Sequence, residues 1–236
     1  MQRFLPRGVA PGEPDWGGFA GRLVEIVARR ADGAHFPAEL SVCLGGGAGG
    51  RIALVRLADV SGRAGRLAEL ERRALHDLLT GLPNRCLLDD RLTQELRLAR
   101  RSGQPLAVLM LDLDRFKQVN DRCGHQVGDR LLQAVAGRLR ATMRTCDTLG
   151  RLGGDEFLAV LPAPTGRRVA CRVAGRLVTA LRPPIRLDGA SFRVGLSVGI
   201  AIWPEHGPEP ATLLARADGA MYRAKRERSG FRLCRG

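Results

Sequence analysis

The sequence predicts an α/β fold of the α+β kind for residues 77–236, with a central antiparallel sheet flanked by helices. Three observations lead to it: a nearly all-apolar run at Pro105–Asp112, a Gly-Gly turn at 153–154 between two short strand patterns, and helical periodicity around both. An all-apolar run is typical of a central strand buried on both faces. The predicted order, strand–helix–helix–strand–strand–helix–strand, corresponds to a ferredoxin-like palm arrangement.

The N-terminal part is predicted to be β-rich. Residues 1–20 contain much Gly and Pro and show no periodicity, and two β-rich runs around Asp32-Gly33 then predict a hairpin. A glycine-rich break at 45–50 precedes a third strand, predicted at Arg51–Val60. Three antiparallel strands with so few residues cannot close a core of their own.

The run Ala28–Val42 resembles the C-terminal hairpin of a PAS sensor domain. The resemblance covers roughly the last half of that fold and implies a partial PAS-like segment at 1–60. The part of a PAS domain that usually builds the ligand pocket has no counterpart, so no haem, flavin or small-molecule signal is carried over. An unrelated β-hairpin is the alternative interpretation.

A linker helix is predicted at 61–76, where Leu67, Leu70, Ala74 and Leu75 form one apolar stripe. So short a helix is marginal alone in water. It could pair with a second copy as a short coiled coil, or lie as a solvated linker on its own domain.

The domain at 77–236 begins with a turn in which Asn84 is a plausible N-cap. The elements that follow are predicted as a helix at Arg85–Arg101, the strand at Pro105–Asp112, helices at 115–123 and 127–143, two strands flanking 153–154, a helix at 165–182, a strand at 191–202, a helix at 210–227 and a last strand at Phe231–Cys234.

Charge, cysteine content and apolar runs limit the kinds of ligand and cellular location that we expect. The net charge is +14, yet 36 of the 38 basic residues are arginine and aromatic content is 4%, a bias that favours a nucleotide ligand over nucleic acid. Six scattered cysteines without CxxC spacing indicate reduced thiols, several of them buried. No apolar run approaches the roughly 20 residues needed to span a bilayer, so we expect a cytoplasmic location without a membrane span.

Carboxylates gather in two segments that the predicted sheet would bring together. Asp112 and Asp114 point to the same side at the end of the apolar strand, although Asp114 also suits a helix cap. Asp155 and Glu156 follow the Gly-Gly turn. If that hairpin pairs with the apolar strand, Asp112 meets Asp155, and such close charges require a cation. Oxygen ligands favour Mg²⁺ or Mn²⁺, and a carboxylate–metal site suits attack of a hydroxyl on a phosphate.

Five motifs resemble the successive signatures of GGDEF-domain diguanylate cyclases, and their order and spacing cover 77–236. They are DLLTGLPNR at 77–85, DLDRFKQVND at 112–121, GHQVGD at 124–129, RLGGDEF at 151–157 and ADGAMYRAK at 217–225. The resemblance implies condensation of two GTP into cyclic di-GMP and two pyrophosphates. It also implies a homodimer, because each domain holds one GTP.

The resemblance further implies roles for individual residues. Asp112, the carbonyl of Leu113, and Asp155 would hold the metal ions, Mg²⁺ or Mn²⁺. Glu156 would complete that site or help deprotonate the attacking 3′-hydroxyl. The residues expected to bind GTP are Asn120 and Asp129 at the guanine edge, and Phe116, Lys117, Gly154 and Lys225 near the phosphates. Lys117 and Lys225 are the two lysines of the whole chain.

A product-inhibition site is implied at Arg144-Thr-Cys-Asp147, by its offset from the Gly-Gly turn. There the arginine would bind a phosphate or guanine of cyclic di-GMP, and the aspartate would accept from guanine. By itself, an RxxD pattern is a common surface ion pair. Arg176 is a candidate for the complementary arginine from a second molecule.

One departure from the family pattern concerns the phosphate-binding arginine that usually follows Lys225 in a Gly-Arg-Asn sequence. It is displaced here, and either Arg228 or Arg232 could replace it. Two other functions stay open: a non-catalytic receptor for cyclic di-GMP or GTP, and a truncated, inactive signalling fragment.

Overall fold

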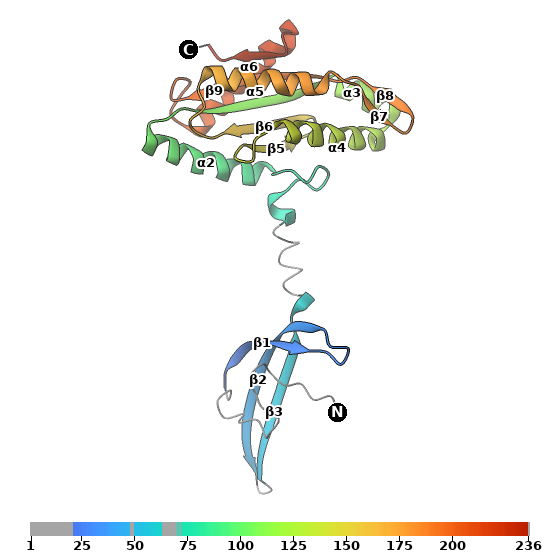
Figure 1. Cartoon of the computed structure of the whole chain (residues 1–236), viewed down its shortest axis with the longest axis vertical. Helices are drawn as coiled ribbons and strands as arrows, with labels where there is room; N and C mark the ends of the chain where they lie inside the picture. Colours follow the sequence, from blue (N-terminus) through green and yellow to red (C-terminus); the bar gives the residue numbers. More distant parts are fainter. Residues whose placement is uncertain (1–20, 48–49, 63–69, 71, 236) are drawn as a thin grey trace. The chain divides into compact units, whose positions relative to one another are not determined.

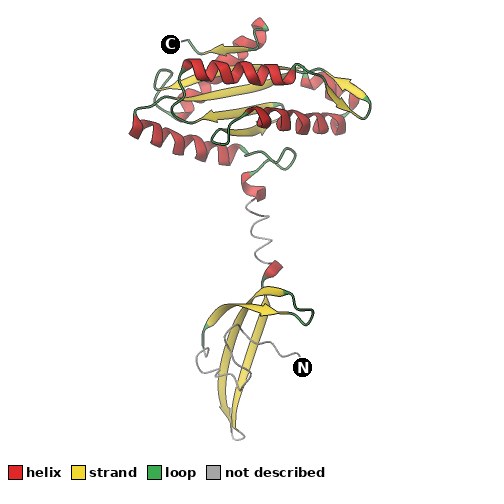
Figure 2. Ribbon diagram, in the orientation of Figure 1, coloured by secondary structure: helices red, strands yellow, loops and turns green. Residues whose placement is uncertain are grey.

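The structure is a computed structural model that describes residues 21–47, 50–62, 70 and 72–235. The chain divides into two compact units, Met1–Arg72 and Arg73–Gly236, each described here by itself (Figures 1 and 2).

The first unit is a three-stranded antiparallel sheet of β1 (Leu23–Arg29), β2 (His35–Gly47) and β3 (Gly50–Asp59), in that order. The predicted hairpin is confirmed: Arg30 N donates to Ala34 O over 2.8 Å, and Gly33 has φ 90°. The predicted break at 45–50 is wrong, because the pairing of β2 with β3 continues to Gly47 opposite Gly50. Glycine weakens a strand but does not prevent its ladder hydrogen bonds, since it keeps both its backbone N–H and its carbonyl.

The described core of this sheet is small, with Ala28, Phe36 and Ala38 as its buried cluster. Its likeness to a PAS segment stays a prediction. Of the helix predicted at 61–76, residues 61–62, 70 and 72–75 are helical, and the others, Leu67 among them, lie outside the described residues, apart from His76.

The second unit contains the predicted palm. Its helices are α2 (Arg85–Ser102), α3 (Phe116–Cys123), α4 (His125–Thr142), α5 (Arg167–Leu181) and α6 (Pro210–Glu227). Its strands are β4 (Leu106–Asp114), β5 (Thr148–Gly153), β6 (Glu156–Leu161), β7 (Ile185–Leu187), β8 (Ala190–Phe192), β9 (Gly195–Trp203) and β10 (Phe231–Leu233). The main sheet has the order β10-β9-β4-β6-β5, so the apolar run forms the central strand, as predicted.

Helices cover both faces of this sheet (Figure 2). The odd-numbered residues of β4, such as Leu109 and Leu111, pack in one core with α4 and α5. The even-numbered residues, such as Val108 and Met110, pack in a second core with α2 and α6. Alternation along the strand therefore directs Asp112 to the α2/α6 face.

Three local expectations have different outcomes. Asn84 caps α2, since its side chain accepts from Leu87 N, as predicted. The strand predicted at 191–202 is wrong in its first part, because β7 and β8 form a separate hairpin before β9 begins at Gly195. All six cysteines are free thiols, but only Cys234 is buried. Cys171 is partly buried and packs against the core on the α4/α5 face, and the other four are exposed.

None of the helices in the described ranges is both long and apolar enough to cross a membrane.

Candidate active site at the end of the central strand

The end of β4 brings together the carboxylates that the sequence singled out. Asp112 is paired in register with Glu156 on β6, so both side chains lie on the same face of the sheet. Leu113 N donates to the carbonyl of Asp155 over 3.3 Å, which holds the end of the turn against β4. The expected meeting of Asp112 with the Asp155-Glu156 segment is thereby confirmed in the geometry of the backbone.

Asp114 has a different partner from the one considered in the sequence. Its carboxylate accepts from the hydroxyl of Ser197 on β9 over 2.7 Å. It does not cap α3, whose N-cap is Arg115 with φ 64° and no side-chain hydrogen bond. A Cβ on Gly195 would lie 2.3 Å from Asp114 Oδ2, so glycine is needed opposite this carboxylate.

The turn after β5 depends on backbone conformations that favour glycine. Gly153 has φ 148° and Gly154 has φ 52°, and a Cβ on either would meet no heavy atom within 4 Å. Both glycines therefore leave open space above the backbone, where another group can approach. This fits the expected role of Gly154 beside a phosphate.

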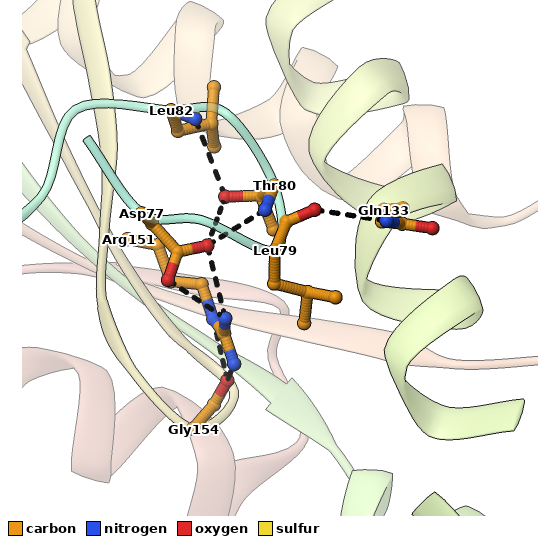
Figure 3. A network of polar contacts seen from close by, with 7 residues as sticks. All are labelled: Asp77, Leu79, Thr80, Leu82, Gln133, Arg151 and Gly154. Carbon is orange, nitrogen blue, oxygen red and sulfur yellow. Dashed lines mark hydrogen bonds and ion pairs between the residues drawn. The ribbon is translucent and has the colours of Figure 1, made fainter. Parts of the chain in front are cut away.

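The side chain of Arg151 holds this turn by hydrogen bonds. Its Nε and a terminal nitrogen donate to the carbonyl of Gly154 over 3.0 and 2.7 Å. Its other terminal nitrogen donates to both carboxylate oxygens of Asp77, each over 3.1 Å (Figure 3). Such forked, charge-assisted bonds hold geometry well. The arginine joins the first residue of the predicted domain to the carboxylate-bearing turn.

Asp77 is in turn held by its own loop. The backbone N and the hydroxyl of Thr80 donate to Asp77 Oδ1 over 2.8 and 2.6 Å, and the carbonyl of Leu79 accepts from Gln133 on α4 (Figure 3). Burial raises the pKa of Asp77, but the hydrogen bonds from Thr80 and Arg151 outweigh it and set the pKa below the usual 3.8. The sequence analysis assigned no role to Arg151 or Asp77, because their contact joins residues 74 positions apart.

Lys225 on α6 reaches the same edge of the sheet. Its Nζ donates to Asp112 Oδ1 over 2.6 Å. Burial raises the pKa of Asp112, Lys225 lowers it, and the charges of Asp155 and Asp114 raise it, with a net rise. Burial lowers the pKa of Lys225, but Asp112 raises it more. The pKa of both groups therefore rises. For Asp112, whose side chain is 12% exposed, burial outweighs the ion pair. For Lys225, whose side chain is 43% exposed, the ion pair outweighs burial.

Asn120 lies against the next helix in an unusual way. Its Oδ1 is buried and has no hydrogen-bond partner, the one such side-chain atom in the part of the chain that the structure describes. A Cβ on Gly128 of α4 would lie 1.8 Å from this oxygen, so the amide occupies the space that glycine leaves. An unpaired buried acceptor is costly unless a donor reaches it. Asp129, which follows Gly128 in the chain, is exposed.

The two remaining GTP-binding candidates are on the first turn of α3. The ring of Phe116 is buried, and its Cζ would lie 3.3 Å from a Cβ on Gly128. Lys117 is exposed. Phe116 therefore anchors α3 against α4, and its backbone, with Lys117, starts the helix directly after β4.

The Arg144–Asp147 segment is a turn at the end of α4. Asp147 is buried, and its Oδ2 accepts from the backbone N of Arg144 over 2.9 Å. Arg144 itself is exposed. Arg176 of α5 donates to the carbonyl of Thr142 over 3.0 Å, so it lies next to this turn in the same chain. The aspartate holds the turn, and the two arginines remain at the surface.

Arg228 and Arg232, the two candidates for the phosphate-binding arginine, have different surroundings. Arg232 forms an ion pair with Glu227. Arg228 ends α6 in a left-handed conformation with φ 52° and lines a pocket that also contains Lys225. The geometry favours Arg228.

The donor set suits a hard divalent cation that is shared with a substrate. Among the described residues, no group of three or more His, Cys, Asp or Glu side chains could hold a metal ion by itself. Mg²⁺ is commonly bound by one or two carboxylates together with substrate phosphates. Asp112 already attracts the ammonium of Lys225, which shows that this carboxylate accepts a cation. Asp112, Asp155 and the carbonyl of Leu113 thus fit such an ion.

Residues 74–230 match the family model described as diguanylate cyclase, GGDEF domain. The chain belongs to the GGDEF family. The palm fold and the carboxylate-bearing turn at Gly153–Phe157 are therefore those of a GGDEF domain, as the sequence resemblance implied.

Curated relatives agree with this assignment. The chain is 46% identical over 166 residues to the diguanylate cyclase TpbB of Pseudomonas aeruginosa, which covers 70% of this chain and 38% of TpbB. It is 46% identical over 176 residues to the bifunctional diguanylate cyclase/cyclic di-GMP phosphodiesterase MucR of the same organism, covering 74% of this chain and 25% of MucR. The chain thus spans well under half the length of both relatives.

Solved GGDEF structures have the same fold. The isolated GGDEF domain of TpbB has a TM-score of 0.65 at 46% identity, covering 68% of this chain and 94% of that one. The coiled coil and GGDEF domain of DgcB from Caulobacter crescentus, solved in complex with c-di-GMP, has a TM-score of 0.65 at 27% identity and covers 74% of this chain and 92% of that one.

Proposed function

We propose that the chain is a diguanylate cyclase that condenses two GTP into cyclic di-GMP and two pyrophosphates. Membership of the GGDEF family supports this function. The single structural observation that carries it is the register of Asp112 opposite Glu156, with Lys225 on the same carboxylate. This arrangement places anionic and cationic groups where a hydroxyl, a phosphate and a divalent cation have to meet.

Guanine binding is assigned to Asn120 and Asp129. The buried Oδ1 of Asn120 lacks a donor, and guanine offers one at its ring N1–H or exocyclic amine. The exposed carboxylate of Asp129 accepts from the same edge of the base. Adenine presents no such pair of donors there, so this site rejects ATP.

The triphosphate is assigned to the start of α3 and the end of α6. The backbone N–H groups of Phe116 and Lys117 are in the first turn of α3, where they have no intrahelical acceptor. Lys117 and Lys225 add positive charge. Gly154 has no side chain and open space around it, so a phosphate can approach its backbone.

The carboxylates are assigned to the chemical step. Asp112, Asp155 and the Leu113 carbonyl would hold Mg²⁺ or Mn²⁺, which supplies charge stabilisation at the phosphate. Glu156 completes this donor set or accepts the proton of the 3′-hydroxyl. The 3′-oxygen then bonds to the α-phosphorus of the other GTP, the α–β phosphoanhydride bond breaks, and pyrophosphate leaves with its electron pair.

Two copies of the chain are needed for this reaction, because each GGDEF domain holds one GTP and each 3′-hydroxyl attacks the other nucleotide. We infer a homodimer, with the helix at 61–76 and the β-rich segment at 1–60 setting the pairing. GTP is a cytoplasmic nucleotide, so we place the reaction in the cytoplasm.

Product inhibition is assigned to the turn at Arg144–Asp147. Asp147 uses Oδ2 to hold the turn, which leaves the guanidinium of Arg144 exposed for a phosphate or guanine of cyclic di-GMP. Arg176 lies beside the turn and adds a second cation.

The test is the stoichiometry of the reaction. Purified protein with GTP and Mg²⁺ should release two pyrophosphates for each cyclic di-GMP, measured by chromatography and a phosphate assay, and ATP should give neither. Binding of cyclic di-GMP without any turnover of GTP would instead support a receptor and would overturn the proposal.

A further inference from the structure

A hollow of about 230 Å³ lies on the α2/α6 face of the sheet, next to the carboxylate edge. Its lining includes the buried side chains of Met110 and Leu158, which are paired in register two residues along from Asp112 and Glu156. Glu156 lines the hollow as well. The other charged residues of the lining are Arg85 and Asp89 of α2 and Asp218 of α6. Three carboxylates and one guanidinium therefore surround an apolar base.

The charged residues that α2 and α6 contribute to this hollow are exposed and unpaired. Arg85, Asp89 and Asp218 form no ion pair with another residue that the structure describes. Arg100, near the other end of α2, differs, since it pairs with Glu209 over 2.8 Å. An arginine of α2 thus has a partner in the same chain at one end of the helix, and Arg85 has none at the other.

The place of Arg85 in α2 makes the missing partner costly. Arg85 is the first residue of the helix, directly after the N-cap Asn84, and the first turn contains no acidic residue. The N-terminus of a helix carries a partial positive charge, so a cation there is destabilising and a nearby carboxylate is stabilising. A carboxylate from another molecule would remove this repulsion.

The proposed reaction brings a second copy of the chain to this hollow. It requires two GGDEF domains whose Glu156 edges face each other, and Glu156 lines the hollow. A two-fold contact uses the same patch on both copies, so each charged group has to meet an opposite charge of that patch. The net charge of +14 makes two copies repel as a whole, whereas carboxylates outnumber the arginine here.

We propose that two copies of the chain dock at this hollow, with Arg85 of each copy paired with Asp218 of the other. This inference rests on the proposed function, which brings the two Glu156 edges together. Asp89 is a poorer partner, because it lies on α2 itself and would bring the positive N-termini of two α2 helices together. Asp218 lies in the middle of α6, away from both ends of that helix.

The test is a charge swap between two copies of the whole chain. Arg85→Glu places a carboxylate opposite Asp218, and Asp218→Arg places a cation opposite Arg85. Each variant alone should therefore form cyclic di-GMP at least roughly tenfold more slowly than wild type. In an equimolar mixture, a dimer with one copy of each variant has opposite charges at both contacts. We expect the mixture to regain roughly half of the wild-type rate or more, since random pairing makes half of the dimers mixed.

Asp89→Arg is the matched control, because it makes the same change of charge in the same hollow. Mixed with Arg85→Glu, it should not restore the rate. Self-association of every protein and mixture is also measured by sedimentation equilibrium without GTP, so that the test does not depend on turnover. We expect each single variant to associate more weakly and the Arg85→Glu and Asp218→Arg mixture to recover. Thermal unfolding of each variant excludes loss of fold.

Single variants that match wild type in both measurements overturn the inference, and so does a mixture that recovers in neither. Recovery only in a chain that carries both changes would place the pair within one copy, and equal recovery with Asp89→Arg would indicate bulk charge alone; either result overturns the pairing. The two proposals fail separately. Recovered association in a protein that makes no cyclic di-GMP upholds the docking and overturns the function. Unchanged association and unchanged cyclic di-GMP formation in every variant uphold the function and overturn the docking.

Discussion

Lys225 and Asp112 form an ion pair of 2.6 Å that joins the last turn of α6 to the central strand of the sheet. The pair links residues 113 positions apart, at the edge where Glu156 lies opposite Asp112. In the proposed reaction, the metal ion competes with Lys225 for Asp112, and the phosphate competes with Asp112 for Lys225. Asp112 would hold the cation, and Lys225 would bind the phosphate.

Replacing Lys225 by methionine should reduce kcat/KM for GTP roughly 100-fold, because a fixed positive charge at the reacting phosphates is lost. Arg226→Met is the matched control, since Arg226 lies one residue further and stacks over Tyr222 at 6.0 Å. Initial rates of cyclic di-GMP formation check this expectation. Similar rates in the two variants would show that Lys225 has no part in phosphate binding.

Gly128→Ala should displace Asn120, because the new Cβ would lie 1.8 Å from Asn120 Oδ1. We expect KM for GTP to rise at least tenfold, since a shift of about 1 Å in a positioning group is costly. Gly137→Ala, on the same helix, meets no heavy atom within 4 Å and should be stabilised by up to roughly 1 kcal/mol without a change in KM. A Gly128→Ala enzyme with unaltered KM would refute the role given to Asn120.

Stability in acid should depend on Asp77. The folded pKa of this carboxyl lies below its usual 3.8, so its contribution is fully present above pH 3.8 and is lost as the pH falls through the folded pKa. Asp77→Asn should lower the free energy of unfolding at neutral pH and flatten its fall in acid, measured by urea titration. Combined with Arg151→Ala, the loss should be less than additive, because both remove the same pair. Additive losses would contradict this coupling.

Arg144→Ala should relieve inhibition by added cyclic di-GMP, with the inhibition constant raised at least tenfold and thermal stability unchanged. Asp147→Ala should relieve inhibition too, but it should also lower stability by about 1 kcal/mol, since Asp147 is buried and holds the backbone N of Arg144. Turnover at graded concentrations of cyclic di-GMP separates the two variants. Inhibition that is unaffected by Arg144→Ala would place the inhibitory site elsewhere.

Local chemistry explains what could be predicted from the sequence. The all-apolar run of β4 and the side-chain cap at Asn84 are decided by neighbouring residues, and the structure has both. The meeting of Asp112 with the Asp155-Glu156 turn needed one assumption, that the hairpin pairs with β4. The palm order followed from the order of periodic segments.

Contacts between distant segments explain what could not be predicted. The alternation of 191–202 concealed the β7–β8 hairpin, because its turn at Asp188-Gly189 lies before the segment read as a strand. The hydroxyl of Ser197 takes Asp114, which by sequence alone suited a helix cap. The choice of Arg228 over Arg232 depended on which of them Glu227 pairs with, a question of conformation at the end of α6.

The most direct test of the carboxylate edge compares wild type with Asp112→Asn and Glu156→Ala, each shown to be folded by thermal unfolding. Each protein is incubated with GTP and Mg²⁺, and cyclic di-GMP is quantified by chromatography. The account predicts cyclic di-GMP from wild type and at least roughly 100-fold less from each variant. Equal product from wild type and either variant, or none from folded wild type at any protein concentration, would contradict it.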